Sequence, residues 1–366
     1  MIVEVARADL SRVRTREVVS EPLTDGQARI RIDAFALSSN NITYAVFGDA
    51  MHYWDFFPVD GDDARVWGRI PVWGVGDVVE SRSPSCVVGE RLYGFFPMAS
   101  ELVIEPGRSD EGGVTDVSAH RGAMAGAYNR YTRCAADALY RADRERQQML
   151  LYPLFFTSFL IDDYLADHDD LGARQIVVSS ASSKTSIGVA FLARRRGQRV
   201  VGLTSARNAQ FVDELGTYDR VVTYDDIAAL ERVPAVYVDV AGNADVRHAV
   251  HTHLSGMLEH SMTVGDTHWD HHAEVATDDL PAPTPSFFFA PEQIKQRTRQ
   301  WGRDELDRRL GEAWNEFSDW TEEWIEFHDA TGPDAVTAVY SELLAGTPDP
   351  RAGFIGSLTG DEAARA

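Results

Sequence analysis

Hydroxyl side chains and one lysine crowd a single turn of the sequence, SSASSKTS at residues 179–186, between an apolar run and a helical pattern. Where such a turn opens a helix, backbone amides and hydroxyls can donate hydrogen bonds to a phosphate, and a lysine adds positive charge. Dinucleotide-binding folds usually carry a glycine-rich turn here. A Ser/Thr helix cap beside a surface lysine is the competing interpretation, and the turn alone does not decide between them. The residues predicted to contact phosphate are Ser180, Ser182, Ser183, Lys184 and Thr185.

A second group of polar residues, LTSARN at residues 203–208, follows the next apolar run. NAD-binding folds usually place a carboxylate here for the ribose 2′-hydroxyl, whereas this segment has hydroxyls and an arginine. A guanidinium can hold a 2′-phosphate through two parallel hydrogen bonds. The segment therefore predicts NADP(H) rather than NAD as the cofactor, held by Thr204, Ser205 and Arg207. Two glycines further along the chain, Gly242 and Gly265, are also expected to belong to the cofactor site.

Histidines gather in a third segment, where His268, His271 and His272 lie in HWDHH. Imidazole suits zinc, iron or nickel, so a metal-dependent hydrolase or lyase is one hypothesis. The zinc-protease pattern, however, needs a glutamate directly after the first histidine, and Trp269 stands there. We therefore predict no metal site, and a solvated loop is the simplest interpretation of the segment.

The elements that must position these residues follow from the hydrophobic pattern. Residues 1–106 contain short runs with period-two alternation, such as ARIRIDAFALS, which predict a compact β barrel. Residues 133–170 are helical in pattern, and we expect Pro153 to divide them because proline disrupts a helix interior. From residue 175 onward, apolar runs alternate with helical stretches, which predicts βαβ units and a parallel sheet. Residues 291–327 form an amphipathic helical stretch whose aromatic side chains we expect to face the core: Trp301, Trp314, Phe317, Trp320 and Trp324.

Composition narrows the function classes. The net charge is −22, which argues against binding to nucleic acid or to anionic membranes. The longest apolar stretch, LLYPLFFTSFLI, is too short to span a bilayer. The chain has two cysteines, Cys86 and Cys134, which we expect to be free thiols in a reducing compartment. These features together predict a cytoplasmic protein with a small-molecule substrate.

The order of these segments resembles the medium-chain dehydrogenase/reductase superfamily, nearest to its zinc-independent, quinone-oxidoreductase-like branch. More closely, TSFLIDDYLA, SSASSKTSIG and SFFFAPEQIKQRTRQWG are similar to the uncharacterised bacterial family DUF2855. The resemblance implies an α/β fold: a GroES-like β-barrel catalytic domain over residues 1–135 and a Rossmann doubly wound parallel sheet over 136–285. Residues 286–366 would form a C-terminal helical segment that returns to the catalytic domain. The zinc ligands of the alcohol dehydrogenases are missing, because two cysteines cannot build them.

The same resemblance implies an activity: hydride transfer from NADPH to a small carbonyl compound or to a conjugated enone or quinone. Asn41 and Tyr44 would line the nicotinamide pocket, where Tyr44 would donate a proton or hydrogen bond, and His268 would lie nearby. The exposed sheet edges of this superfamily also imply a homodimer. In this chain, serines and Lys184 replace the glycines of the family's phosphate-binding turn. The alternative is therefore a catalytically inactive nucleotide-binding or scaffold protein on the same fold. The aromatic run at residues 52–68 is expected either to wall the substrate site or to close a core.

Overall fold

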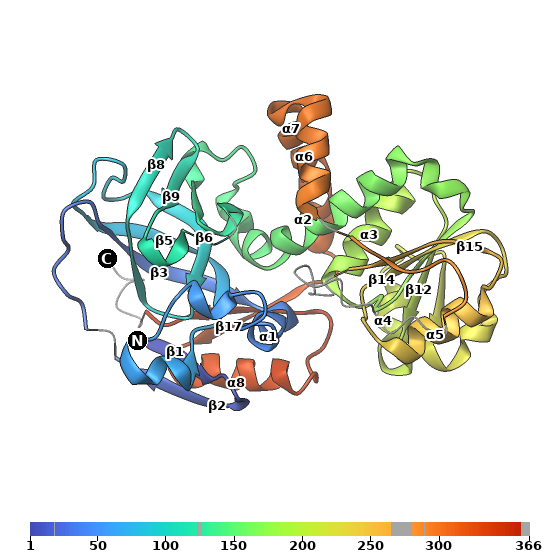
Figure 1. Cartoon of the computed structure of the whole chain (residues 1–366), viewed down its shortest axis with the longest axis horizontal. Coiled ribbons are helices and arrows are strands. Elements are labelled where there is room, and N and C mark those ends of the chain that lie inside the picture. The colour runs from blue at the N-terminus through green and yellow to red at the C-terminus, as the bar shows by residue number, and fades with distance from the viewer. Residues whose placement is uncertain (18, 123, 125, 265–279, 289, 360–366) are drawn as a thin grey trace. The chain divides into compact units, whose positions relative to one another are not determined.

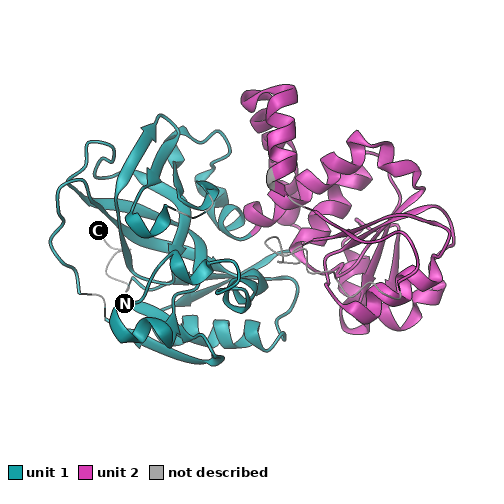
Figure 2. Ribbon diagram, viewed as in Figure 1, with its two compact units in different colours: residues 1–150, 325–366 teal, residues 151–324 magenta. Residues whose placement is uncertain are grey.

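The computed structural model describes residues 1–17, 19–122, 124, 126–264, 280–288 and 290–359. The chain divides into two compact units, drawn in different colours in Figure 2: Met1–Leu150 with Ile325–Ala366, and Leu151–Trp324. This division differs from the expected one in two places. The first boundary lies at residue 150 rather than 135, and residues 286–324 belong to the second unit. Residues 290–321 form helices that pack on other helices of the second unit: Phe317 stacks on Phe155, and Glu316 pairs with Arg195.

Unit 1 is built from two sheets. The smaller one pairs β1 (Ile2–Ala6) with β2 (Asp9–Arg16) and β4 (Trp67–Gly68). The larger one is antiparallel except for its first pair and has the order β17 (Glu326–Thr331), β18 (Ala352–Ser357), β3 (Ala28–Leu37), β5 (Pro71–Ser81), β6 (Arg91–Pro97), β10 (Arg130–Arg133), β9 (Gly113–Asp116), β8 (Pro106–Asp110), with β7 (Glu101–Ile104) also paired to β3. The α-helices α1 (Ser39–Val46) and α8 (Pro333–Leu344) lie within this unit. The strands predicted from period-two alternation are confirmed.

Helix α2 (Glu145–Asp167) is continuous, and Pro153 lies inside it. The prediction that this proline divides the segment is therefore wrong. Proline removes one backbone donor, but aromatic packing holds the helix on both sides of it: Tyr152 and Phe155 lie 5.2 and 5.6 Å from the ring of Trp314. By length and composition α2 is apolar enough to cross a membrane, yet 56% of its most apolar stretch is buried inside the protein. It is a helix of the core.

Unit 2 holds a six-stranded parallel sheet, as the alternation of strands and helices predicts. Its order is β13 (Arg220–Thr223), β12 (Val200–Thr204), β11 (Gln175–Val178), β14 (Ala235–Asp239), β15 (Leu258–Thr263), β16 (Ser286–Phe287). The helices between the strands are α3 (Lys184–Arg195), α4 (Ala209–Glu214) and α5 (Ala244–His253). The chain runs outward from β11 through β12 to β13 and then returns to the other side of β11. Ligands of such sheets bind at this reversal, beyond the carboxyl ends of the strands.

Two helices, α6 (Ala290–Trp301) and α7 (Arg303–Thr321), extend from unit 2 and are coloured orange in Figure 1. Gly302 separates them with a φ of +83°, a conformation that favours glycine. Trp314 and Phe317 of α7 are buried, and Phe317 stacks on Phe155 of α2 at 4.6 Å. The prediction that the aromatic stripe faces the core is confirmed for these two residues.

His251 of α5 is buried, and its ring joins two parts of unit 2. One ring nitrogen lies 2.8 Å from the Pro281 carbonyl oxygen and the other 2.9 Å from the Ser261 hydroxyl. Burial lowers the pKa of His251 from its ordinary 6.5. On acidification, the unfolded chain therefore binds a proton at this histidine before the folded chain does. The neutral ring contributes its full stability above pH 6.5, and this contribution is lost as the pH falls toward the pKa of the folded state.

We expect a His251→Asn variant to be less stable than the parent at pH 7.5, and this difference to narrow on acidification below pH 6.5. Urea unfolding of both proteins at several pH values measures it. A difference that stays constant with pH would show that the pKa of His251 is the same in the folded and the unfolded chain.

Candidate functional site

The turn between β11 and α3 is held largely by its own serines. Ser183 is the N-cap of α3, and its hydroxyl accepts a hydrogen bond from the Ser186 amide at 3.2 Å. The Ser186 hydroxyl donates in turn to the Ser179 carbonyl at 2.8 Å. Ser180 has a φ of +50°, so the turn adopts a left-handed conformation without a glycine. The helix-cap interpretation of Ser183 is thus confirmed, and a phosphate at this turn would meet a preformed helix N-terminus.

Segments that flank the neighbouring strands β12 and β13 also fix this turn. The Ser180 amide donates to the Tyr224 hydroxyl at 2.9 Å, and the Tyr218 hydroxyl donates to the Ala181 carbonyl at 2.8 Å. The Asn208 side chain donates to the Ser182 hydroxyl at 3.0 Å. The Ser180 amide therefore already has an acceptor within the fold.

A buried network joins this turn to the end of β14. The Ser179 hydroxyl donates to Asp239 Oδ1 at 2.8 Å and accepts from the amides of Val240 and Ala241, both at 2.9 Å. The other oxygen of Asp239 pairs with Arg247 Nε at 2.7 Å, and both side chains are buried. Gly242, predicted to belong to the site, donates its amide to Asp239 Oδ1 at 3.1 Å.

Except for its glycine, this network was not predicted from the sequence. An acidic residue three positions before a glycine was visible in the pattern. The partner, Arg247, was not, because it lies on α5 and meets Asp239 only when that helix packs on the sheet.

The end of β12 carries the residues predicted to select the 2′-phosphate. Thr204 is buried, Ser205 is half-buried and Arg207 is exposed, in the short turn of helix Ala206–Asn208. The Asn208 contact with Ser182 described above ties this end of β12 to the β11–α3 turn. The structure thus brings Ser182 and the Arg207 segment together at the same carboxyl edge of the sheet.

In unit 1, Asn41 uses its whole side-chain amide within the fold. Its oxygen accepts from the Ser38 amide at 2.7 Å, which forms a capping box at the start of α1, and its nitrogen donates to the Pro71 carbonyl at 2.9 Å. The side chain is buried. Asn41 therefore holds α1 to β5, which accounts for both of its polar atoms.

Tyr44 lies one helical turn further along α1, in an aromatic cluster. Its ring centre is 4.5 Å from that of Tyr53 and 5.5 Å from that of Phe95, and its hydroxyl accepts from Trp73 Nε1 at 3.4 Å. Burial raises the pKa of Tyr44 well above its usual range, and raises that of Tyr53 to about 12. Both phenols are therefore neutral at physiological pH, and each can donate a proton or hydrogen bond but cannot act as a base.

The aromatic run at residues 52–68 contributes mainly to the core of unit 1. Its buried side chains are Tyr53, Trp54, Phe56 and Phe57. The sequence left two interpretations open, a wall of the substrate site or part of a core. The burial of these four side chains favours the core. Phe56 and Phe57 pack on Phe95 of β6, with ring centres 5.2 and 6.3 Å apart. Period-two and helical patterns do not encode such a contact.

Two predicted residues, His268 and Gly265, lie outside the described residues, as do His271 and His272. Within the part of the chain that the structure describes, His, Cys, Asp and Glu form no group of three or more placed to hold a metal. Of the described histidines near this segment, His260 on β15 lies 3.1 Å from the Ser286 hydroxyl, and burial lowers its pKa.

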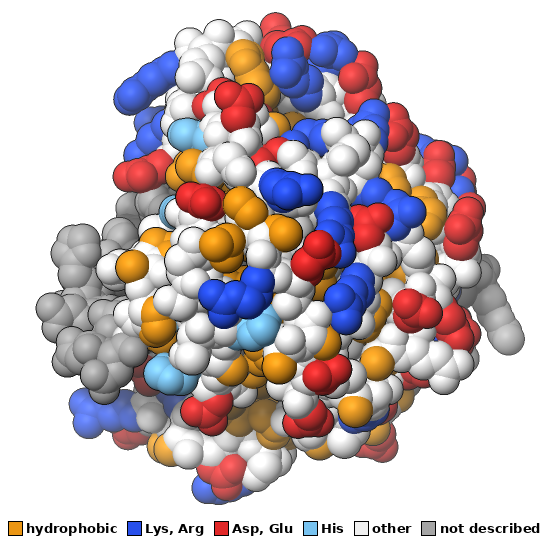
Figure 3. Space-filling view, turned by 90° about the vertical axis from the view of Figure 1, so that its right-hand side faces the viewer, with side chains coloured by type: hydrophobic (Ala, Val, Ile, Leu, Met, Phe, Trp, Pro, Cys, Tyr) orange, Lys and Arg blue, Asp and Glu red, His pale blue; other side chains and the backbone are white. Residues whose placement is uncertain are grey.

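Charges of both signs alternate over the face of the molecule shown in Figure 3, and no continuous basic patch stands out on it. Phosphate backbones of nucleic acids reward a concentrated basic surface.

Comparisons with known proteins agree with this architecture. The profile of a family described as "Protein of unknown function (DUF2855)" matches residues 35–349. No curated protein sequence matches the chain.

Several solved structures are similar over nearly their whole length. CurA from Vibrio vulnificus in complex with NADPH is 13% identical, with 95% of this chain and 94% of that chain covered and a TM-score of 0.55. The quinone oxidoreductase from Coxiella burnetii is 13% identical, with 98% and 99% covered and a TM-score of 0.55. The yhdH oxidoreductase from Salmonella enterica in complex with NADP is 13% identical, with 95% and 96% covered and a TM-score of 0.51. At these identities the likeness shows a shared fold.

Proposed function

Because the chain belongs to the DUF2855 family and has the fold of the medium-chain reductases, we propose that it is an NADPH-dependent, zinc-free oxidoreductase. Its substrate would be a small carbonyl compound or a conjugated, enone- or quinone-like compound. One observation carries the proposal: the carboxyl edge of the unit 2 sheet combines the capped N-terminus of α3 and Lys184 with Arg207, and residues 203–208 contain no carboxylate.

The residues at this edge fit NADPH. Lys184, Thr185 and the α3 N-terminus would hold the pyrophosphate, and Thr204, Ser205 and Arg207 would hold the adenosine ribose with its 2′-phosphate. Gly242 has a φ of +64° and open space where a side chain would stand, so a ligand can approach its backbone closely. When bound, NADPH would supply a hydride for the substrate.

Tyr44 would supply the hydrogen-bond donor for the substrate oxygen. Its phenol is neutral and accepts from the Trp73 indole, which orients the hydroxyl and leaves its own proton for another acceptor. The aromatic rings packed around Tyr44 would suit a flat substrate. Asn41 would act indirectly, because it fixes the helix that carries Tyr44.

The Tyr44→Phe variant tests this role. We expect turnover of NADPH with a naphthoquinone or an enone to fall about 100-fold, since general acid catalysis typically contributes that much, while NADPH affinity changes less than about twofold. Tyr53→Phe is the matched control, because it removes a neighbouring buried phenol from the same cluster. Equal turnover in Tyr44→Phe and the parent protein would remove Tyr44 from the proposed reaction.

A second candidate function is a catalytically inactive nucleotide-binding or scaffold protein on the same fold. Two observations favour it: the Ser180 amide and the Ser183 hydroxyl are already satisfied within the turn, and Tyr44 is buried. NADPH binding without turnover of any carbonyl or quinone would select this alternative. A metal-dependent hydrolase using the histidines of residues 260–272 would require bound metal, which elemental analysis of the purified protein detects.

We further propose that the protein works in the cytoplasm as a homodimer and without nucleic-acid or membrane partners. The acidic net charge of −22 supports the exclusion of polyanionic partners. The proposal of a dimer is supported only by the exposed sheet edges of this superfamily, and sedimentation of the purified protein tests it.

A further inference from the structure

Trp73, on β5, faces the hydroxyl of Tyr44, which the proposed reaction uses as its proton donor. The indole Nε1 donates a hydrogen bond to the Tyr44 oxygen at 3.4 Å. Tyr44 is buried, whereas Trp73 is half-buried. The Asn41 side chain ties the two elements together, since its nitrogen donates to the carbonyl of Pro71, two residues before Trp73. The contact between the indole and the phenol therefore joins two elements that are already fixed to each other.

Aromatic packing fixes the direction of the indole. The ring of Tyr93 stacks on it, with ring centres 5.5 Å apart and planes inclined by 21°, and Phe95 packs beside it at 5.2 Å. Trp73 lies opposite Phe95 in the β5–β6 ladder, so both side chains leave the sheet on the same face. Tyr128 also packs on the indole, at 6.0 Å. A donor held in this way needs no reorganisation when negative charge develops on its acceptor.

A second donor meets the Tyr44 oxygen from α1 itself. The Asn40 side chain, four residues before Tyr44, also forms a hydrogen bond with the Tyr44 hydroxyl. Burial raises the pKa of Tyr44 and the neighbouring Tyr128 adds to this rise, whereas the hydrogen bonds from Trp73 and Asn40 oppose it. A hydroxyl oxygen has two lone pairs besides its proton. With both lone pairs facing donors, the Tyr44 hydroxyl keeps its proton for a third group.

We propose that Trp73 is a positioning residue of the reductase, which strengthens Tyr44 as the acid that protonates the substrate oxygen. The inference rests on the proposed function. When the substrate carbon accepts a hydride, the electron pair of the C=O bond moves to the oxygen. The O–H bond of Tyr44 then breaks, and its proton joins the substrate oxygen. The bonding pair stays on Tyr44 as a phenolate, which the Trp73 N–H stabilises more strongly than the neutral phenol until water returns a proton.

The Trp73→Phe variant tests this role, because it keeps an aromatic ring in the stack and removes the N–H donor. We expect kcat with the naphthoquinone or enone that the parent reduces to fall about tenfold, since a hydrogen bond to a charged group contributes at least this factor. KM and NADPH affinity should stay within about twofold of the parent. In a Tyr44→Phe background the same substitution should change kcat less than about twofold, because Trp73 acts through the Tyr44 hydroxyl.

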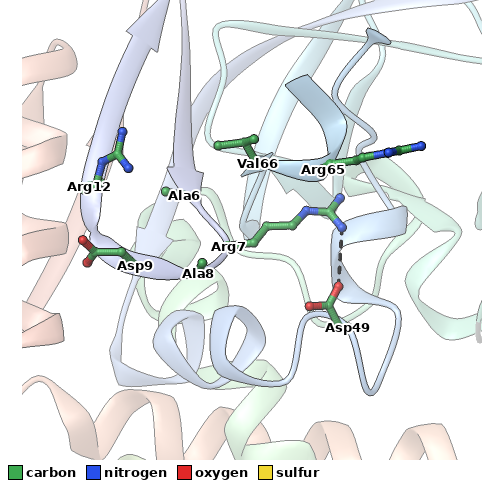
Figure 4. A pocket seen from close by; sticks show the side chains of 8 residues that line it. All are labelled: Ala6, Arg7, Ala8, Asp9, Arg12, Asp49, Arg65 and Val66. Atoms are coloured by element: carbon green, nitrogen blue, oxygen red, sulfur yellow. Dashed lines mark hydrogen bonds and ion pairs between the residues drawn. The ribbon is translucent and has the colours of Figure 1, made fainter. Parts of the chain in front are cut away.

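Trp67→Phe is the matched control in the same unit. It makes the same substitution at another half-buried tryptophan, whose ring packs on the guanidinium of Arg12. Trp67 follows Val66, which lines the surface cavity shown in Figure 4, and neither Tyr44 nor Trp73 belongs to that lining. The control variant should therefore retain the kcat of the parent.

A spectroscopic measurement tests the hydrogen bond without turnover. In protein labelled with ¹⁵N at its tryptophans, the indole resonance of Trp73 is identified by its loss in Trp73→Phe. We expect this resonance to move upfield in Tyr44→Phe, because the substitution removes the acceptor of the indole N–H.

The outcomes separate the failure of this inference from the failure of the proposed function. A parent protein that reduces no carbonyl compound or quinone would overturn both. An active parent whose kcat is unchanged in Trp73→Phe would overturn only the role of Trp73. An equal tenfold loss in the Tyr44→Phe background, or an indole resonance that does not move in Tyr44→Phe, would do the same. Circular dichroism of each variant confirms that the fold is retained.

Discussion

Replacing Arg207 by alanine is expected to weaken NADPH binding by about 10- to 100-fold and to leave NADH binding within about twofold of the parent protein. The nucleotides differ only in the 2′-phosphate, and Arg207 is the cationic side chain of residues 203–208, where NAD-binding folds carry a carboxylate. Hydrogen bonds to charged groups are worth about 1.5–3 kcal/mol, which corresponds to this range of affinity. Titration of the protein with each nucleotide, followed by fluorescence, measures both constants.

Two further variants sharpen this experiment. Arg207→Lys keeps the charge but loses the paired hydrogen bonds, so its NADPH affinity should lie between those of the parent and the alanine variant. Arg220→Ala removes another exposed arginine of unit 2, at the amino end of β13, and should leave both affinities unchanged. An equal loss of NADPH and NADH binding in Arg207→Ala would show that Arg207 does not recognise the 2′-phosphate.

Asp239→Ala is expected to lower the free energy of unfolding of unit 2 by about 3–5 kcal/mol. The substitution leaves Arg247 buried without its ion-pair partner, and breaking one side of a buried pair costs about this much. It also removes the acceptor of the Ser179 hydroxyl and the Gly242 amide. Urea unfolding followed by the fluorescence of the unit 2 tryptophans measures the change.

An exposed pair of the same unit provides the control for this prediction. Glu316 pairs with Arg195 at 2.6 Å, with both side chains about half exposed (52% and 45%), and Glu316→Ala should cost less than about 1 kcal/mol. If Asp239→Ala costs no more than Glu316→Ala, the buried network does not stabilise the carboxyl edge of the sheet as we describe.

The elements of both units were accessible from the sequence because local periodicity determines them. Period-two alternation marked β3 and β5, and apolar runs alternating with helical stretches marked the parallel sheet from β11 to β14. Pro153 was misjudged because a propensity rule for isolated helices ignores the packing of α2 against Trp314.

The candidate site was accessible only in part. Ser183 and Arg207 could be placed because a residue at a strand end or helix start has its position fixed by local structure. The roles of Asn41, Tyr224 and Arg247 could not be placed, because each depends on a partner from another element. Asn41 reaches the Pro71 carbonyl, Tyr224 the Ser180 amide, and Arg247 the Asp239 carboxylate. Such contacts exist only in the folded chain, and single-sequence patterns carry no signal for them.

The central claim is that the unit 2 sheet binds NADPH in preference to NADH, and thermal unfolding with and without each nucleotide tests it most directly. A ligand that binds only the native state stabilises it by about 2.7 kcal/mol at a concentration 100 times its Kd. We predict a Tm that rises with NADPH concentration and rises much less with NADH at the same concentrations. A Tm that neither nucleotide changes at millimolar concentration would contradict the account.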